Sequence, residues 1–500
     1  MKKRWSIMIL IIAVCLLTAL TAGCKNDKMA TGNVDVEKYT MDLKLDTEKK
    51  TLSGEVVMAL TNHAGETLDE ICIRNYAASI LADRGKGKSQ FQSITTEDGQ
   101  KLNFDTGKDP SVVYAKLDKS LSPGDSVSLK VKFLTDIPKK NDRFGYRKDK
   151  AGQLFLLSFC FPQAAMYEDG KWNENPYIDG AESTFNKVTD YDIRLTAPEE
   201  YLIAASGEER SEGSVTEIHA KDMRDMAIVA CDYMEVETGT AAGVEINNYT
   251  LQYENSEKTN ELTMAATKDS VELFTKCFGK YPYEELDVIQ CFIQGGMEYP
   301  GLIMICLWDM APENYYDAID DYSNYTYLCE LISHETGHEW FYAAVGNDQY
   351  EEPWLDEGFA EFCNILYDME MPDSLERGIS IVAKKSGKDA AWLQWDSEEI
   401  EKWYLPVSPD EKKRVINMPY DWYDEGRKRG DYNTQVYNNG ALFLYELKKN
   451  MGDEKFFEAM QEYYKTYCLK IATGEDFLNM IKKYDDSKKI EKVIEKYMEL

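Results

Sequence analysis

The chain has 500 residues, of which 43% are hydrophobic and 12% aromatic, so it can form two or three folded domains and is not a disordered protein. Its formal net charge is −32, because 89 acidic side chains face only 57 lysines and arginines. This negative charge argues against a nucleic-acid partner and against electrostatic attraction to anionic lipid.

The first 23 residues are typical of an export signal. A basic start, Lys2 to Arg4, precedes the apolar run IMILIIAVCLLTAL, and small residues then lead to Cys24. The pattern resembles a bacterial lipoprotein signal that is cleaved before Cys24, whose thiol would carry the lipid. An uncleaved anchor is the alternative, because the apolar run is near the lower limit for a membrane span. In both cases we expect an extracytoplasmic protein tethered to the cell membrane.

Residues 24–35 are polar and are expected to form a tether. Residues 36–247 then show the period of a β domain: TLSGEVVMALTN from Thr51 and SVSLKVKFLTDIP from Ser126 both alternate apolar with polar residues. Because the strands are short and separated by turns, we expect an antiparallel β saddle or sandwich.

From residue 248 to 500 the pattern becomes that of a mixed α/β domain, which makes the fold class α+β. Residues 260–279 predict a helix that is closed by a glycine. Two short apolar strands follow around a Gly-Gly pair. Residues 396–435 are charged, aromatic and rich in proline, and we expect an irregular segment there, with helices resuming from about Val436.

The segment LISHETGHEWF holds His334 and His338, two of only four histidines in the chain. On a helix this H-E-x-x-H spacing puts both imidazoles on one face, where they reach the same ion. Two neutral imidazoles suit Zn²⁺, which in a catalytic site takes three protein ligands and a water. Glu335 is rotated off the ligand pair and is suited to act on that water as general base. The alternative is two histidines that only pack on a helix face.

The third ligand is predicted from the spacing. WLDEGFAEF begins at Trp354 and predicts a second helix start, with Glu357 19 residues after His338. That length lets the first helix end near Gly346 and the second return antiparallel, with Glu357 facing the metal. Glu361 lies on the same face, either as a partner of a ligand or in solvent, and we favour solvent.

HETGHEWF followed by WLDEGFAEF resembles the zinc signature of the alanyl-aminopeptidase family of gluzincin metallopeptidases. The family pattern is H-E-x-x-H, eighteen residues, and then the ligand glutamate in W-L-x-E-G-F-A. The resemblance implies a thermolysin-like catalytic domain with one Zn²⁺ per chain. It places His334, His338 and Glu357 as ligands and Glu335 as general base.

GGMEYPG, starting at Gly295, is similar to the Gly-x-Met-Glu-Asn exopeptidase motif of that family, with Tyr299 in place of the asparagine. The resemblance implies that Glu298 grips the free α-ammonium group of a peptide, and so fixes where its N-terminus lies. Gly295, Gly296 and Met297 belong to the same substrate-binding segment, in which the glycines let a substrate backbone approach closely.

Tyr437, in VYNNGALFLYEL, matches the family tyrosine that precedes x-x-Gly-Ala and donates to the tetrahedral oxyanion. Asn439 stands where the family has lysine, and a tyrosine that only packs is the alternative. The chain ends about 60 residues after Tyr437. We therefore expect it to lack the long helical C-terminal domain of the larger family members, while the rest of the resemblance covers nearly all of the mature chain.

Together these patterns predict a lipid-anchored zinc aminopeptidase that acts on peptides. A zinc endopeptidase with an open cleft is one alternative. A peptide-binding lipoprotein without activity is another, although binding alone would not need Glu335. The oligomeric state and the preferred N-terminal residue stay open.

Overall fold

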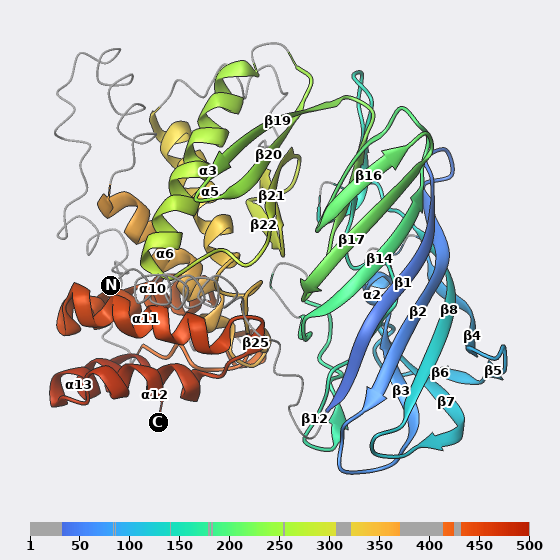
Figure 1. Ribbon diagram of the computed structural model, residues 1–500, viewed down its shortest axis with the longest axis horizontal. Coiled ribbons are helices and arrows are strands. Elements are labelled where there is room, and N and C mark those ends of the chain that lie inside the picture. The colour runs from blue at the N-terminus through green and yellow to red at the C-terminus, as the bar shows by residue number, and fades with distance from the viewer. Residues whose placement is uncertain are drawn as a thin grey trace, which may run out of the picture. The chain divides into compact units, whose positions relative to one another are not determined.

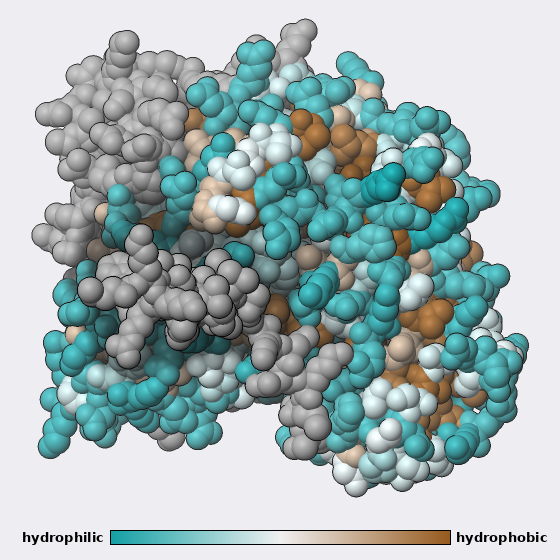
Figure 2. Space-filling model, viewed as in Figure 1, coloured by the Kyte–Doolittle hydropathy of each residue, from teal (hydrophilic) through white to brown (hydrophobic). Residues whose placement is uncertain are grey.

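Residues 33–499 are described by a computed structural model, apart from 84, 86, 141, 179–180, 182–183, 254–255, 307–321, 371–413 and 425–431. The predicted signal, Cys24, most of the tether and most of the predicted irregular segment lie outside the described residues. Within the described part, no helix combines the length and the apolar character that a membrane crossing needs. Hydrophilic residues dominate the face shown in Figure 2, in keeping with the acidic composition.

An eight-stranded sheet is the largest element of the N-terminal half (Figure 1). Its neighbouring strands are antiparallel except β1 and β14, which run parallel. Buried and exposed residues alternate along β1 and β2, so one face of these strands packs on the core, as the sequence period predicts. In sheet order the strands are β16 (Glu208–Glu212), β17 (Val215–Met223), β14 (Thr189–Thr196), β1 (Val34–Asp46), β2 (Thr51–Asn62), β8 (Ser126–Asp136), β4 (Ser89–Thr96) and β5 (Lys101–Leu102).

Two four-stranded antiparallel sheets accompany it. One has the order β11 (Gln163–Ala164), β3 (Leu68–Arg74), β7 (Val112–Leu121) and β6 (Phe104–Thr106). The other has the order β15 (Leu202–Ala205), β18 (Ile228–Cys231), β10 (Gln153–Leu157) and β9 (Phe144–Lys148). Short elements between them are α2 (Tyr76–Asp83), β12 (Tyr167–Glu168) and β13 (Lys171–Trp172). The predicted antiparallel β domain is confirmed.

A five-stranded mixed sheet follows. β20, β21 and β23 run parallel and are buried almost throughout, whereas β19 and β22 are antiparallel edge strands. The order is β19 (Met234–Ala241), β20 (Val244–Leu251), β21 (Glu285–Cys291), β23 (Leu302–Cys306) and β22 (Gly296–Tyr299). The segment predicted as two strands around the glycine pair thus forms three. The predicted domain boundary at 247/248 falls inside β20 and stays a prediction.

Helices pack against this sheet and then form the end of the chain (Figure 1). The predicted helix at 260–279 is part of α3, which ends at Cys277 just before Gly279, whose φ of +134° suits only glycine. The expected helices after Val436 are also present. The helices are α3 (Glu257–Cys277), α5 (Tyr322–His338), α6 (Glu357–Glu370), α9 (Tyr420–Asp424), α10 (Asn439–Met451), α11 (Asp453–Tyr467), α12 (Gly474–Tyr484) and α13 (Lys488–Tyr497).

Helix α5 ends at His338 and does not continue to Gly346, so the predicted end of this helix is wrong. The backbone widens directly after the second histidine, where the Ala343 N–H donates to the carbonyl of His338 at 2.9 Å. Tyr342 has a φ of +124°, an unfavourable conformation for a residue with a Cβ. The chain then forms β24 (Val345–Gly346), which pairs with β25 (Lys470–Ile471).

Arg224, which is 2% exposed, holds this widened turn from the N-terminal half. Its guanidinium donates to the carbonyls of Tyr342 at 3.0 Å, Ala344 at 3.4 Å, Asn186 at 2.6 Å and Lys470 at 3.0 Å. These carbonyls satisfy a buried cation that would otherwise be costly. The buried apolar side chains of both halves also join into one continuous core cluster.

Candidate metal centre and active site

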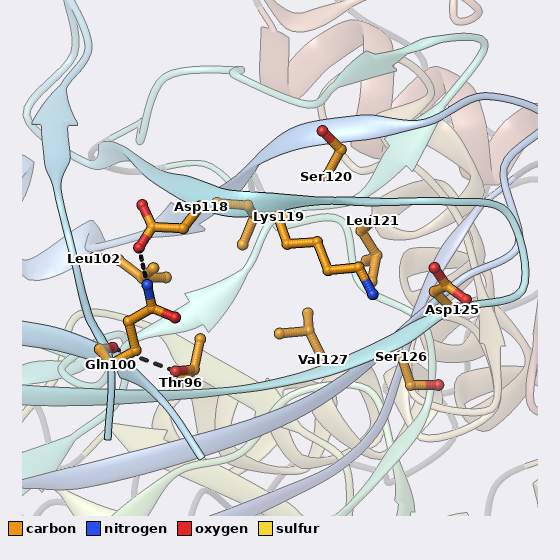
Figure 3. A pocket seen from close by; sticks show the side chains of 11 residues that line it. Thr96, Gln100, Leu102, Asp118, Lys119, Ser120, Leu121, Asp125, Ser126 and Val127 are labelled. Atoms are coloured by element: carbon orange, nitrogen blue, oxygen red, sulfur yellow. Dashed lines mark hydrogen bonds between the residues drawn. The ribbon is translucent and has the colours of Figure 1, made fainter. Parts of the chain in front are cut away.

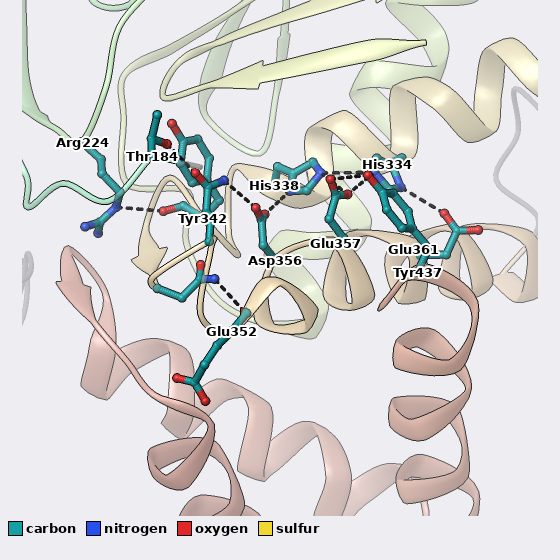
Figure 4. Close-up of polar contacts among 12 residues, drawn as sticks. Thr184, Arg224, His334, His338, Tyr342, Glu352, Asp356, Glu357, Glu361 and Tyr437 are labelled. Atoms are coloured by element: carbon teal, nitrogen blue, oxygen red, sulfur yellow. Dashed lines mark hydrogen bonds and ion pairs between the residues drawn. The ribbon is translucent and has the colours of Figure 1, made fainter. Parts of the chain in front are cut away.

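The end of α5 and the start of α6 bring the three predicted ligands together (Figure 4). Nε2 of His334 lies 3.1 Å from Nε2 of His338, and Oε2 of Glu357 lies 3.2 Å and 3.4 Å from these two nitrogens. A tetrahedral zinc ion with bonds of about 2.0–2.1 Å separates its ligands by about 3.3–3.4 Å. The three atoms therefore fit one zinc ion and leave a fourth position for water.

The electrostatics of this triangle favour a cation at its centre. Burial lowers the pKa of His334, but hydrogen bonds with Glu357 and Glu361 outweigh this effect and raise the pKa to about 10. For His338 burial acts in the same direction and is again outweighed, here by the charges of Asp356 and Glu298, so its pKa is raised well above the usual range. Positive charge is therefore stabilised where the donor atoms converge, whether a proton or a divalent ion supplies it.

Each imidazole has a carboxylate behind it, which orients the ring and fixes its tautomer. Nδ1 of His334 lies 3.1 Å from Glu361, and Nδ1 of His338 lies 2.6 Å from Asp356. Our preference for a solvated Glu361 was wrong, because its side chain is only 19% exposed and faces the ligand. Asp356 was missed, although its place directly before the ligand Glu357 was a signal that could have found it.

Glu335, the predicted general base, is 4% exposed on α5 and lies against strand β22. A Cβ added at Gly296 would stand only 2.1 Å from Oε1 of Glu335, so only glycine allows this approach. Gly295, with a φ of +76°, forms the turn before the strand. The glycine pair predicted to admit a substrate backbone thus also makes room for the general base.

Glu298 is 5% exposed on the same strand and lies beside the second histidine. Its carboxylate, a ring nitrogen of His338 and a carboxylate oxygen of Asp356 lie within 4.8 Å of one another. The turn that follows this strand is anchored next to the second histidine, because the Gly301 N–H donates to Oε2 of Glu339 at 3.0 Å. Glu298 is therefore held beside the predicted zinc ligands.

The neighbours of Glu298 on β22 differ in their surroundings. Met297 is partly buried against the core. Tyr299, which departs from the family asparagine, is 1% exposed and donates from its hydroxyl to Oγ of Ser158 at 2.7 Å. Tyr299 thus ties β22 to a loop of the N-terminal half.

Tyr437 lies in a π-helical turn (Asn433–Asn438) that precedes α10. Its hydroxyl donates to Oε1 of Glu357, and its ring stacks on His334 with centroids 6.0 Å apart and planes 8° apart. Two glycines make this approach possible, because a Cβ at Gly358 would stand 3.0 Å from the Cα of Gly440. The backbones of α6 and α10 touch there, which brings the phenol to the ligand. Wide turns of this kind are frequent at functional sites.

The structure therefore gathers His334, Glu335, His338, Glu357, Glu298 and Tyr437 in one site. A hollow away from this site, formed by the β4–β5 and β7–β8 regions of the N-terminal half, is lined by mixed charges and apolar side chains (Figure 3). Its charged groups are Asp118, Lys119 and Asp125, and it shares none of the predicted site residues.

A helix with H-E-x-x-H and a ligand glutamate on the next helix defines the gluzincin class of zinc metallopeptidases. Residues 262–497 match the Peptidase family M1 domain. The family expected from the motifs is thereby confirmed.

Curated relatives carry aminopeptidase names. The chain is 25% identical to human endoplasmic reticulum aminopeptidase 2 over 282 residues, which cover 53% of this chain and 26% of that protein. It is 22% identical to aminopeptidase 2 of Candida albicans over 415 residues, or 76% of this chain and 40% of that one. The chain thus spans well under half the length of these relatives.

Solved structures share the fold over nearly the whole chain. The M1 zinc metallopeptidase of Deinococcus radiodurans aligns with a TM-score of 0.59 at 18% identity, over 92% of this chain and 93% of that one. A point mutant of the same enzyme, bound to a Tyr-Ser-Ala substrate, aligns with a TM-score of 0.58 at 17% identity, over 93% and 94% of the two chains. The α+β fold is confirmed by this likeness.

Proposed function

We propose that the protein is a zinc-dependent aminopeptidase that removes N-terminal residues from peptides. The observation that carries the proposal is the donor triangle of His334, His338 and Glu357, with spacings that fit a zinc ion and with Glu335 and Glu298 beside it. When bound, zinc polarises the scissile carbonyl and acidifies a water. Glu335 accepts a proton from the attacking water and passes it to the leaving amine.

Glu298 and Tyr437 orient the substrate and stabilise charge. The buried carboxylate of Glu298 is the binding group for the α-ammonium of a peptide, which sets cleavage one residue from the end. The phenol of Tyr437 donates to Glu357 in the free protein. With a peptide bound, the same hydroxyl would donate to the oxyanion that develops on the scissile carbonyl.

The names of the relatives and the tripeptide bound by the Deinococcus mutant support peptides as substrates. Of the alternatives, an open-cleft endopeptidase would not need a buried carboxylate beside the metal, and an inactive peptide-binding protein would not need Glu335.

The test is a panel of fluorogenic aminoacyl amides and peptides, each with a free and an N-acetylated terminus. We expect the free forms to be cleaved and the acetylated forms to be poor substrates, with activity lost on chelation and restored by zinc. Glu298→Ala should reduce cleavage of free termini while zinc content stays at one per chain. Efficient cleavage of blocked peptides would favour the endopeptidase instead.

We also propose that the protein lies outside the cytoplasm, anchored to the membrane by lipid on Cys24. The basic start, the apolar run and the small residues before Cys24 support this proposal. Mass spectrometry of the N-terminus should find a lipidated Cys24, and Cys24→Ser should release or misprocess the protein. Membrane retention of Cys24→Ser with residues 1–23 intact would identify an uncleaved anchor.

A further inference from the structure

A chain of buried hydrogen bonds leads away from the second zinc ligand into the N-terminal half (Figure 4). Nδ1 of His338 lies 2.6 Å from Oδ1 of Asp356, and the other carboxylate oxygen accepts from Nε2 of Gln349 at 2.6 Å. The hydroxyl of Thr184 donates to Oε1 of Gln349. All four side chains are buried, with exposures of 1% for His338, 0% for Asp356, 1% for Gln349 and 4% for Thr184.

The donors and acceptors along this series of hydrogen bonds are fixed. Because the Asp356 carboxylate only accepts, the amide NH₂ of Gln349 must face it, and the amide oxygen is left to accept from the Thr184 hydroxyl. Both oxygens of Asp356 then accept hydrogen bonds, one from Gln349 and one from Nδ1–H of His338. This arrangement keeps the proton of His338 on Nδ1 and leaves the lone pair of Nε2 free for the metal.

The same segment is tied to the N-terminal half at further points. Gln349 follows Asp348, whose carboxylate lies 3.5 Å from Nδ2 of Asn173. Arg224 holds the widened turn at Tyr342 and Ala344. Thr184 therefore belongs to a set of contacts through which the N-terminal half holds the connection between α5 and α6.

We propose that Thr184 and Gln349 are positioning residues that set how tightly the metal is held, acting through Asp356 on His338. The inference rests on the zinc site of the proposed function and adds the N-terminal half to it. Replacing a group behind a metal ligand typically weakens metal binding about 10–100-fold. Gln349 is one hydrogen bond further from the metal and Thr184 two, so we expect smaller effects in that order.

The experiment measures the rate at which zinc leaves the loaded full-length protein for a chromophoric chelator. Thr184→Val keeps the shape of the side chain but removes the donor, and Thr184→Ser keeps the donor. Thr216→Val is the matched control, because Thr216 is also 4% exposed and its hydroxyl lies 2.8 Å from Oγ of Ser211 in the N-terminal sheet. Gln349→Glu replaces the donor toward Asp356 with a carboxylate.

We expect zinc release to be about tenfold faster in Gln349→Glu, at the lower end of the range for direct partners, and about threefold faster in Thr184→Val. Thr184→Ser and Thr216→Val should release zinc at the parent rate. The thermal midpoints of the metal-free Thr184→Val and Thr216→Val proteins should agree, since a merely structural role would instead lower the former.

Equal release rates in Thr184→Val and the parent would overturn the inference, and so would equal acceleration in Thr184→Val and Thr216→Val. If Gln349→Glu does not fold, the three threonine variants still decide the question. A parent protein that takes up no zinc would overturn the proposed function as well, whereas a parent with one zinc and unaffected variants would overturn only this inference.

Discussion

The two histidines predicted to bind zinc are supported in different ways. His334 is backed by Glu361, one turn along the helix that carries the ligand Glu357, at 3.1 Å. His338 is backed by Asp356 at 2.6 Å, and through it by Gln349 and a threonine of the N-terminal half. The side chains of the first pair are 12% and 19% exposed, and those of the second pair 1% and 1%.

The difference teaches that one ligand depends on local helix geometry and the other on the joined halves of the chain. Glu357 and Glu361 face the same way because they are four residues apart on a helix. The contact of Thr184 with Gln349 spans 165 residues of sequence and exists only when both halves are folded. Disturbance of the N-terminal half should therefore reach the metal through His338 rather than through His334.

The largest expected effect is on turnover, which depends on both histidines. Smaller effects are on zinc retention, in which we expect the two histidines to differ. Glu335→Gln keeps the shape of the side chain but cannot accept a proton. We expect kcat to fall about 10²- to 10⁴-fold, with one zinc retained. Steady-state kinetics and elemental analysis on the same preparation test this. A near-parent kcat with zinc bound would show that Glu335 is not the base.

The next largest effect on turnover concerns Tyr437, whose ring stacks on His334. Tyr437→Phe removes the proposed donor to the oxyanion, so we expect kcat to fall about 10²- to 10³-fold, with a smaller change in KM. The Phe variants of Tyr432 and Tyr445 are the controls. If a control loses more activity than Tyr437→Phe, the oxyanion role belongs to another tyrosine.

A direct test of the comparison removes the charge behind each imidazole in turn. Asp356→Asn and Glu361→Gln should each weaken zinc binding about 10–100-fold. We expect the larger loss for Asp356→Asn, because its contact is shorter and more deeply buried. Competition with a chelator gives both affinities. A larger loss for Glu361→Gln would break the proposed asymmetry.

The smallest effect concerns a contact between the halves that involves no metal ligand. Glu209 of β16 accepts from the hydroxyl of Tyr249 of β20 at 2.7 Å. Burial raises the pKa of Glu209 to about 7, and burial together with the charge of Glu209 raises the pKa of Glu285 to about 7. These protonated carboxyls stabilise the fold fully below the ordinary pKa of 4.5, and that stability is lost as the pH rises through 7.

We therefore expect the unfolding midpoint to fall between about pH 4.5 and about pH 7, and to fall less in Glu285→Gln. Thermal denaturation of the parent and the variant across this range is the measurement. A variant that follows the parent curve throughout would remove Glu285 as a source of the pH dependence.

Patterns that are local in sequence predicted most of the fold and the three side chains that converge at the end of α5. The period of two identified strands such as β1 and β2, and the spacing of His334, His338 and Glu357 identified the donor triangle. The early end of α5 was not predictable, because it depends on Arg224 binding the carbonyl of Tyr342 across 118 residues. Gln349 was missed for the same reason, since no local pattern marks a residue whose partners come from other elements.

Arg224 limits which chimeras of related peptidases can fold. Its guanidinium donates to carbonyls of three segments, two of them beyond residue 340. A chimera with a foreign N-terminal half that lacks this arginine would remove the guanidinium from the buried carbonyls of Tyr342, Ala344 and Lys470. The Ala344 carbonyl would still accept from the Leu469 N–H at 2.7 Å. A successful exchange would therefore have to carry the arginine across with the graft, together with the threonine at the end of the hydrogen-bond chain.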